Sequence, residues 1–260
     1  MDQQSTRTAD RAYMRDALRR TRLLADLPDE IVDRLSTNGR VLTFQDGEAI
    51  LRQDEPGIGL IVITSGCVVT SRTRTNGRRL IFDLGQPGQI MGTFEAFDGQ
   101  PSPLDNHARG ETRVVLIPYE TLRAAARQFP DLAIAMINLH TRRNRLDFER
   151  MMLVLDSMRV RVAKVLVYFS RGPEATVGEM TLPVRISQDD IGGILGITRA
   201  SANKELVAMT REGILAWHYS HVTVRDMQKL IAVATEQEPL SKDFERGMFG
   251  RSPKHFRTAD

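Results

Sequence analysis

The chain is poor in the residue types that build covalent and metal-bound frameworks. Its 260 residues include one cysteine, Cys67, and five histidines. One cysteine excludes an internal disulfide and any zinc or iron–sulfur site held by four thiolates of this chain. Only His218 and His221 lie close together in the sequence, and a metal held by this pair is the weaker alternative. We therefore predict no metal site.

Long apolar runs are also missing. The densest run, residues 132–139, is eight residues long and includes Asn138, whereas a membrane span needs about 18 residues. The first residues, among them Asp2 and Arg7, contain no apolar core of a signal peptide. Apolar residues make up 41% of the chain and charged residues 27%, which is typical of a folded domain. We expect a cytoplasmic protein.

Net charge and reactive residues exclude few classes of function. The formal charge of +3 is too small to predict nucleic-acid binding. The sequence contains neither a nucleophile paired with a general base nor a glycine-rich loop that cradles phosphates. We therefore predict that the chain is not an enzyme.

Between Val41 and Ile117 the pattern is typical of β-structure. Short β-rich runs, such as 59–64 and 79–82, alternate with glycine-containing turns. These turns are Asp46-Gly47, Pro56-Gly57, Ser65-Gly66, Asn76-Gly77 and Pro87-Gly88. Asn76-Gly77 predicts a two-residue hairpin, which needs positive φ at both central residues. The regular spacing favours a small antiparallel roll or barrel, and helices are predicted before it at 11–24 and 28–35.

The order and spacing of these turns resemble those of the cyclic-nucleotide-binding β-roll. The matching residues are Phe44, Gly47, Leu60, Ile63, Ser65, Gly66, Gly77, Arg78, Leu84, Pro87 and Gly88. The resemblance implies that the next segment binds a cyclic phosphate through the N–H groups of a short helix. In that family a glutamate also holds the ribose, and an arginine neutralises the phosphate.

The segment that follows departs from this binding pattern. Gly92 is in place, but Thr93 occupies the glutamate position and Leu104 falls near the arginine position. Burying a phosphate without a cation is costly, so we do not expect cyclic AMP and we predict no cofactor. The open alternative is that Glu95 and Arg109 act from shifted positions.

A second departure lies on the long helix, where the family's purine contact falls on Arg145. The candidate effector-pocket residues are Gly92, Thr93, Phe94, Glu95, Leu104 and Arg145. Phe94 and Phe97 add bulk where a nucleotide would lie. Some family members carry haem, and Cys67 or His107 would be the ligand in that further alternative.

From Pro130 onward, leucines recur every seven residues, which predicts one long helix that forms a two-stranded coiled coil. The predicted dimer-interface residues are Leu132, Met136, Leu139, Leu146 and Leu153. In the family, this helix forms the homodimer interface. The alternative is an amphipathic helix that packs on its own domain, since Arg143 and Arg150 occupy the other core positions.

The sharpest motif predicts a helix-turn-helix near the C-terminal end. Ser187-Gln-Asp-Asp190 is a capping box that opens a helix over 188–195. Gly196 permits the turn, and Thr198 caps a second helix that reaches about Arg211. Gly192 is small where the two helices cross most closely.

The second helix is predicted to present a basic, polar face to a DNA major groove. Ala202, Leu206 and Met209 face inward, so that Arg199, Ala200, Asn203 and Lys204 face outward. Arginine can bridge guanine O6 and N7, and asparagine can bridge adenine N6 and N7. Thr198 and Ser201 suit phosphate contacts. The alternative is a solvated face without a ligand.

Residues 213–217 and 222–224 predict a β-hairpin wing that lies along the sugar–phosphate backbone. The candidate DNA-binding residues are Ser187, Gln188, Thr198, Arg199, Ala200, Ser201, Asn203, Lys204, His218 and Tyr219.

Together, the roll, the long helix and this hairpin resemble the Crp–Fnr transcription regulators over about residues 25–235. The resemblance implies that Arg199 reads guanine and that Lys204 replaces a second arginine. Ala200 stands where many members have a base-reading glutamate, which implies altered recognition of one base pair.

We therefore expect an α+β fold with an antiparallel β-roll, a dimerisation helix and a winged helix-turn-helix. The expected parts are a helical extension (1–24), the effector domain (25–129), the dimerisation helix (130–156), the DNA-binding domain (157–235) and a flexible tail (236–260). The expected function is a bacterial homodimer that binds a two-fold operator, with RNA polymerase as a further partner. The alternatives are a sensor module that gates a partner protein without binding DNA, and a cupin-like metalloenzyme.

Overall fold

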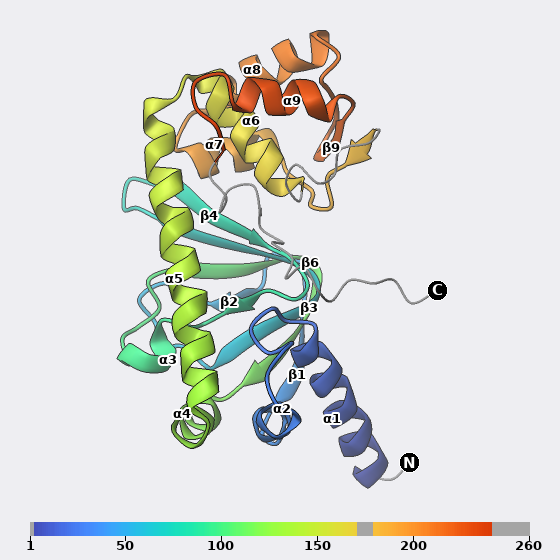
Figure 1. Ribbon diagram of the computed structural model, residues 1–260, viewed down its shortest axis with the longest axis vertical. Helices are drawn as coiled ribbons and strands as arrows, with labels where there is room; N and C mark the ends of the chain where they lie inside the picture. The colour runs from blue at the N-terminus through green and yellow to red at the C-terminus, as the bar shows by residue number, and fades with distance from the viewer. Residues whose placement is uncertain (1–2, 171–178, 241–260) are drawn as a thin grey trace. The chain divides into compact units, whose positions relative to one another are not determined.

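The computed structural model describes residues 3–170 and 179–240, and it divides into two compact units, 1–140 and 141–260 (Figure 1). The division falls within helix α5 (Pro130–Met152), which begins where the long helix is predicted to begin. Of the predicted tail, residues 241–260 lie outside the described residues. The mixed architecture confirms the predicted α+β class.

The N-terminal unit opens with helices α1 (Gln3–Arg19) and α2 (Asp29–Ser36). The prediction that the first helix continues to Leu24 is wrong, because the buried hydroxyl of Thr21 replaces helix bonding. Thr21 Oγ1 donates to the Leu18 carbonyl at 2.7 Å and accepts from the Leu24 N–H at 3.2 Å. The Arg19 guanidinium then binds carbonyl oxygens of the following loop, and this fixes the path of the chain to α2.

Six antiparallel strands build the roll. They are β1 (Arg40–Phe44), β2 (Ala49–Leu51), β3 (Leu60–Thr73), β4 (Arg79–Gly85), β5 (Ile90–Met91) and β6 (Asp105–Ile117). The sheet order is β1-β6-β3-β4, with β2 added to β6 and β5 added to β3. This confirms the predicted antiparallel roll.

Two of the predicted turns differ from expectation. Gly66 lies inside strand β3 as a bulge, because its positive φ of 83° shifts the register against β6. The two-residue hairpin at Asn76-Gly77 is wrong. The connection spans Arg74–Arg78, and of the pair only Gly77 has positive φ, whereas a two-residue turn of the predicted kind needs it at both positions.

Helices α3 (Glu95–Asp98), α4 (Tyr119–Gln128) and the start of α5 pack on the roll. Leu132 and Met136 of α5 are buried, 0% and 2% exposed, in the same core as α1 and α2. The prediction that these two residues form a dimer interface is wrong, because a fully buried side chain has no surface left for a second chain. They support the alternative of packing on the helix's own domain.

Helix α5 ends at Met152, and a 3₁₀ turn, η1 (Leu153–Leu155), follows it. Leu153, predicted to continue the leucine repeat along the helix, therefore lies beyond the helix end and is buried. Leu139 and Leu146 are half-buried, and their role at an interface stays a prediction.

The C-terminal unit is a small helical domain with a three-stranded sheet, ordered β7-β9-β8. Its elements are α6 (Met158–Phe169), β7 (Met180–Thr181), α7 (Gln188–Leu195), α8 (Arg199–Arg211), β8 (Leu215–His218), β9 (His221–Val224) and α9 (Met227–Ala234). Helix α6 packs against α9 and against both helices of the α7–α8 pair (Figure 1), as expected for a winged helix. Within the described ranges, no helix is long and apolar enough to cross a membrane.

Candidate nucleic-acid interface

A complete capping box begins helix α7. The Ser187 hydroxyl accepts from the Asp190 N–H at 3.1 Å, and the Asp190 carboxylate accepts from the Ser187 N–H at 2.7 Å. The same carboxylate also accepts from the Ser187 hydroxyl at 2.8 Å. Such reciprocal bonds satisfy N–H groups that have no partner inside the helix, which explains why α7 covers the predicted residues 188–195.

The turn between α7 and α8 depends on two glycines. Gly196 ends α7 in the left-handed region, with φ of 65°. Gly192 lies against the turn, because a Cβ there would be 3.0 Å from the Ile197 carbonyl oxygen. Thr198 then caps α8 by accepting from the Ser201 N–H at 3.1 Å. The structure therefore confirms the predicted helix-turn-helix geometry.

Helix α8 has one buried face and one polar, exposed face. Ala202, Leu206 and Met209 are at most 2% exposed. Arg199, Ala200 and Lys204 are exposed, and Asn203 is half-buried. The inward and outward assignments are therefore as predicted, while the contacts of each residue with DNA stay predictions.

Gln188 joins the two helices of the motif on this outer face. Its amide Nε2 donates to Asn203 Oδ1 at 2.7 Å, and its Oε1 accepts from Arg199 Nε at 3.2 Å. Three of the candidate DNA-binding side chains thus form one hydrogen-bonded row. Such a row restricts the rotamers of Arg199 and Asn203 before any ligand arrives, which lowers the entropy lost on binding.

Asp189 places a carboxylate beside the same arginine. Its Oδ2 lies 3.7 Å from Arg199 Nη1, and both side chains are about two-thirds exposed or more. Asp189 is not among the site residues predicted from the sequence. The helical spacing could have indicated it, because it lies one residue after Gln188 in the first turn of α7.

The wing is the β8–β9 hairpin, and it presents Tyr219 at its tip. Tyr219 is 84% exposed and has a positive φ of 53°. The His218 ring packs edge-on against it with centroids 4.8 Å apart, and the Trp217 indole N–H donates to the Tyr219 carbonyl. The two predicted wing residues therefore lie together and exposed at one turn.

An ion pair fastens the far end of α8 to α6. Arg159 Nη1 donates to Glu212 Oε1 at 2.9 Å. This hydrogen bond, with the charge of Arg159, holds the pKa of the Glu212 carboxyl below its usual value. The pair thus links the residue that follows α8 to the first turn of α6.

The candidate effector residues lie on the N-terminal unit, except for Arg145. Gly92 has a positive φ of 69°, and a Cβ there would lie 2.4 Å from the Gly59 carbonyl oxygen. Only glycine fits this position. Thr93 is buried, Phe94 is about half exposed and packs on the His140 ring at 5.7 Å, and Leu104 is half-buried.

Glu95 follows Thr93, the expected ribose-binding position, by two residues in the sequence, and it is only 4% exposed. The Tyr119 hydroxyl donates to its Oε2 at 3.3 Å, and Arg123 donates to its backbone carbonyl at 3.0 Å. Burial, followed by the Glu95 charge, raises the pKa of Tyr119 well above its ordinary value. Sequence reasoning missed Tyr119 and Arg123, because they follow Glu95 by 24 and 28 residues in the sequence.

Arg145 belongs to the other compact unit, and its part in an effector pocket stays a prediction. Arg109 lies on β6 with Cys67 of β3 as its register partner. The carboxylate of Glu95 accepts from Tyr119 of α4. That Glu95 and Arg109 supply the missing ribose and phosphate contacts stays a prediction too.

Two family models match the chain, one on each unit. A cyclic nucleotide-binding domain matches residues 41–129, and a Crp-like helix-turn-helix domain matches residues 160–233. The chain belongs to the Crp–Fnr family. This Crp–Fnr protein is a transcription regulator with a helix-turn-helix DNA-binding domain.

Relatives of this Crp–Fnr protein match most of its length. It is 27% identical over 215 residues to the transcriptional activator protein Anr of Pseudomonas aeruginosa. This match covers 82% of this chain and 85% of the relative. It is 23% identical over 219 residues to the CRP-like cAMP-activated global transcriptional regulator of Mycobacterium tuberculosis, covering 84% and 98%. FixK2 from Bradyrhizobium japonicum shares the fold, with a TM-score of 0.68 at 23% identity over 76% and 98% of the two chains.

Proposed function

We propose that this Crp–Fnr protein regulates transcription as a homodimer that binds a two-fold symmetric DNA operator in the cytoplasm. The observation that carries the proposal is the outer face of α8, where Arg199 and Asn203 are joined through Gln188 and Lys204 is exposed. Arginine and asparagine have the geometry to read guanine and adenine in the major groove. Lys204 adds a cation for the same groove.

The dimer we propose uses the exposed side of α5 instead of its leucines. Ile134 and Ile137 are 55% and 63% exposed, and Phe148 and Met151 are 65% and 70% exposed. Together with Thr141 and Asn144, they follow alternating steps of three and four residues, which is the spacing of a coiled-coil seam. We call these six residues the seam; they are Ile134, Ile137, Thr141, Asn144, Phe148 and Met151.

The polar residues in the middle of the seam suit a parallel pair of helices. A polar side chain at one core position lowers stability but specifies register and the number of chains. In a two-fold dimer, Asn144 faces its own copy, and the two amides can bond to each other. Two α8 helices then enter successive major grooves about 34 Å apart.

Selection of duplexes from a random pool by the full-length protein tests the proposal. The expected product is a motif with two inverted half-sites whose centres lie about one helical turn apart. RNA polymerase is the proposed downstream partner. Absence of any enriched motif would overturn the proposal and favour a sensor module that acts without DNA.

We also propose that cyclic AMP is not the effector. Thr93 is buried at the position where the family has its glutamate, and Leu104 supplies no charge near the arginine position. The monoanionic cyclic phosphate would lose water there and gain no cation in return. Calorimetry with cyclic AMP should give no saturable heat, and the affinity for the selected duplex should be the same with and without it. Saturable binding would show that Glu95 or Arg109 supplies the missing contact.

A further inference from the structure

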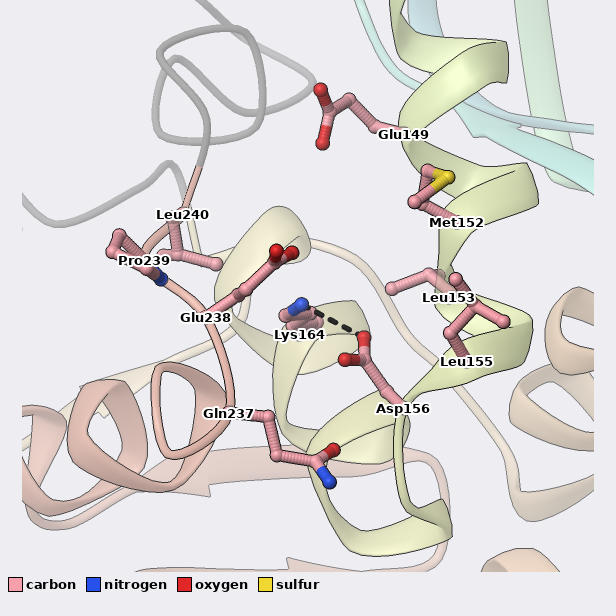
Figure 2. Close-up of a pocket in the computed structure, with 10 residues that line it drawn as sticks. All are labelled: Glu149, Met152, Leu153, Leu155, Asp156, Lys164, Gln237, Glu238, Pro239 and Leu240. Carbon is pink, nitrogen blue, oxygen red and sulfur yellow. Dashed lines mark hydrogen bonds and ion pairs between the residues drawn. The ribbon is translucent and has the colours of Figure 1, made fainter.

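A pocket of about 540 Å³ lies within the C-terminal unit, beside the linker that joins α5 to α6. Three segments line it: the end of α5 with η1, helix α6, and the residues that follow α9 (Figure 2). Its volume is in the range of sites that hold small organic molecules. None of its lining residues belongs to the outer face of α8 or to the candidate effector residues.

The polar part of the pocket carries net negative charge. Lys164 Nζ lies 2.8 Å from Asp156 Oδ2, and both side chains are only 10% exposed. Glu149 and Glu238 add two further carboxylates to the lining. Three carboxylates and one ammonium leave two formal negative charges, because the buried ion pair cancels within itself. This net negative charge favours a cationic ligand.

The remaining surface of the pocket is apolar. Met152 and Leu155 are 53% and 73% exposed although they are large hydrophobic residues. Figure 2 shows Met152 and Leu155 on the α5 side, with Pro239 and Leu240 on the facing segment. Covering such side chains with hydrocarbon is favourable, which a metal ion or a fully polar ligand cannot do.

We infer that this pocket binds a small aliphatic amine of the polyamine class. Its ammonium groups pair with Glu149 and Glu238, and its methylene chain covers Met152 and Leu155. The regulatory consequence rests on the proposed DNA-binding function. Asp156 belongs both to the pocket and to the linker before α6, and through this linker we propose that a bound amine changes the affinity of the protein for DNA.

Calorimetry with spermidine, on the full-length protein without DNA, tests the binding itself. Saturable binding is expected, with no heat from butane-1,4-diol, which has a similar chain but no charge. Glu149→Gln and Glu238→Gln should each weaken binding about fivefold, as expected for exposed ion pairs. Glu120→Gln, an exposed acid of α4, is the matched control and should have no effect. Met152→Gln tests the apolar contact and should also weaken binding.

Binding that is undetectable, or equal in wild type and in the double variant E149Q/E238Q, would overturn the inference. The regulatory part is tested by duplex affinity with and without spermidine. Because polyamines also bind DNA directly, the wild type and the double variant are compared at the same spermidine concentration. A response confined to the wild type supports regulation, and equal responses overturn it. If the protein binds spermidine but no duplex, the pocket stands while the proposed function fails.

Discussion

Replacing Ile137 by alanine tests the proposed seam and separates it from the leucine repeat. The substitution removes three carbon groups, each worth about 0.8 kcal/mol when buried. Because Ile137 is already partly covered and is 63% exposed, dimerisation can bury only about that share. This gives about 1.5 kcal/mol per chain and about 3 kcal/mol per dimer, which corresponds to a dissociation constant about a hundredfold higher.

Sedimentation equilibrium over a range of protein concentrations measures this constant. Ile58→Ala is the matched control, because Ile58 is also a large exposed hydrophobic residue, 49% exposed, but does not belong to α5. Leu132→Ala should instead lower the free energy of unfolding by about 2–5 kcal/mol, as for other buried leucines. Equal dimer constants for Ile137→Ala and Ile58→Ala would refute the seam. If Leu146→Ala alone raised the dimer dissociation constant strongly, the leucine repeat would be the interface instead.

Three further predictions concern the helix-turn-helix domain. Asp189→Asn should tighten duplex binding up to about fivefold, because it removes a negative charge beside Arg199; weaker binding in a fluorescence anisotropy titration would mean that Asp189 itself contacts a base. Ser187→Ala should lower the free energy of unfolding by about 1 kcal/mol through loss of the cap, measured by urea denaturation; an unchanged midpoint would contradict the role of the box. The lowered pKa of Glu212 means that its pair with Arg159 stabilises the fold above the ordinary pKa of 4.5 and that this contribution is lost as pH falls through the lowered pKa. Glu212→Gln should therefore reduce the pH dependence of the urea midpoint in acid, and an identical pH profile would count against the pair.

The helix-turn-helix could be predicted almost residue by residue because its signals are local. Ser187 and Asp190 bond to each other across one helical turn, and Gly196 ends the helix that they begin. Each of these interactions involves residues that are close in the sequence, so the sequence pattern alone predicts them. The antiparallel roll was readable from its local turn signals, although Gly66 forms a bulge inside β3 and the connection at Asn76-Gly77 is longer than predicted.

Contacts between distant residues were not readable. Helix α5 has two stripes that repeat every seven residues, and the sequence does not say which one faces the roll. The structure buries Leu132 in the core of the N-terminal unit and leaves Ile137 exposed, which reverses the predicted assignment. In the same way, the contacts of Glu95 with Tyr119 and Arg123 join segments more than twenty residues apart. Such pairs are formed by the tertiary fold, and no periodic pattern in the sequence predicts them.

The most direct test of the central claim combines a residue change with a base change. Duplex affinity is measured for the wild type and Arg199→Ala, each on the selected motif and on the same motif with one G·C pair of each half-site replaced. If Arg199 reads that guanine, Arg199→Ala costs about 1–3 kcal/mol per contact on the selected motif and almost nothing on the changed one. An equal loss on both duplexes would contradict the claim that the outer face of α8 reads DNA sequence.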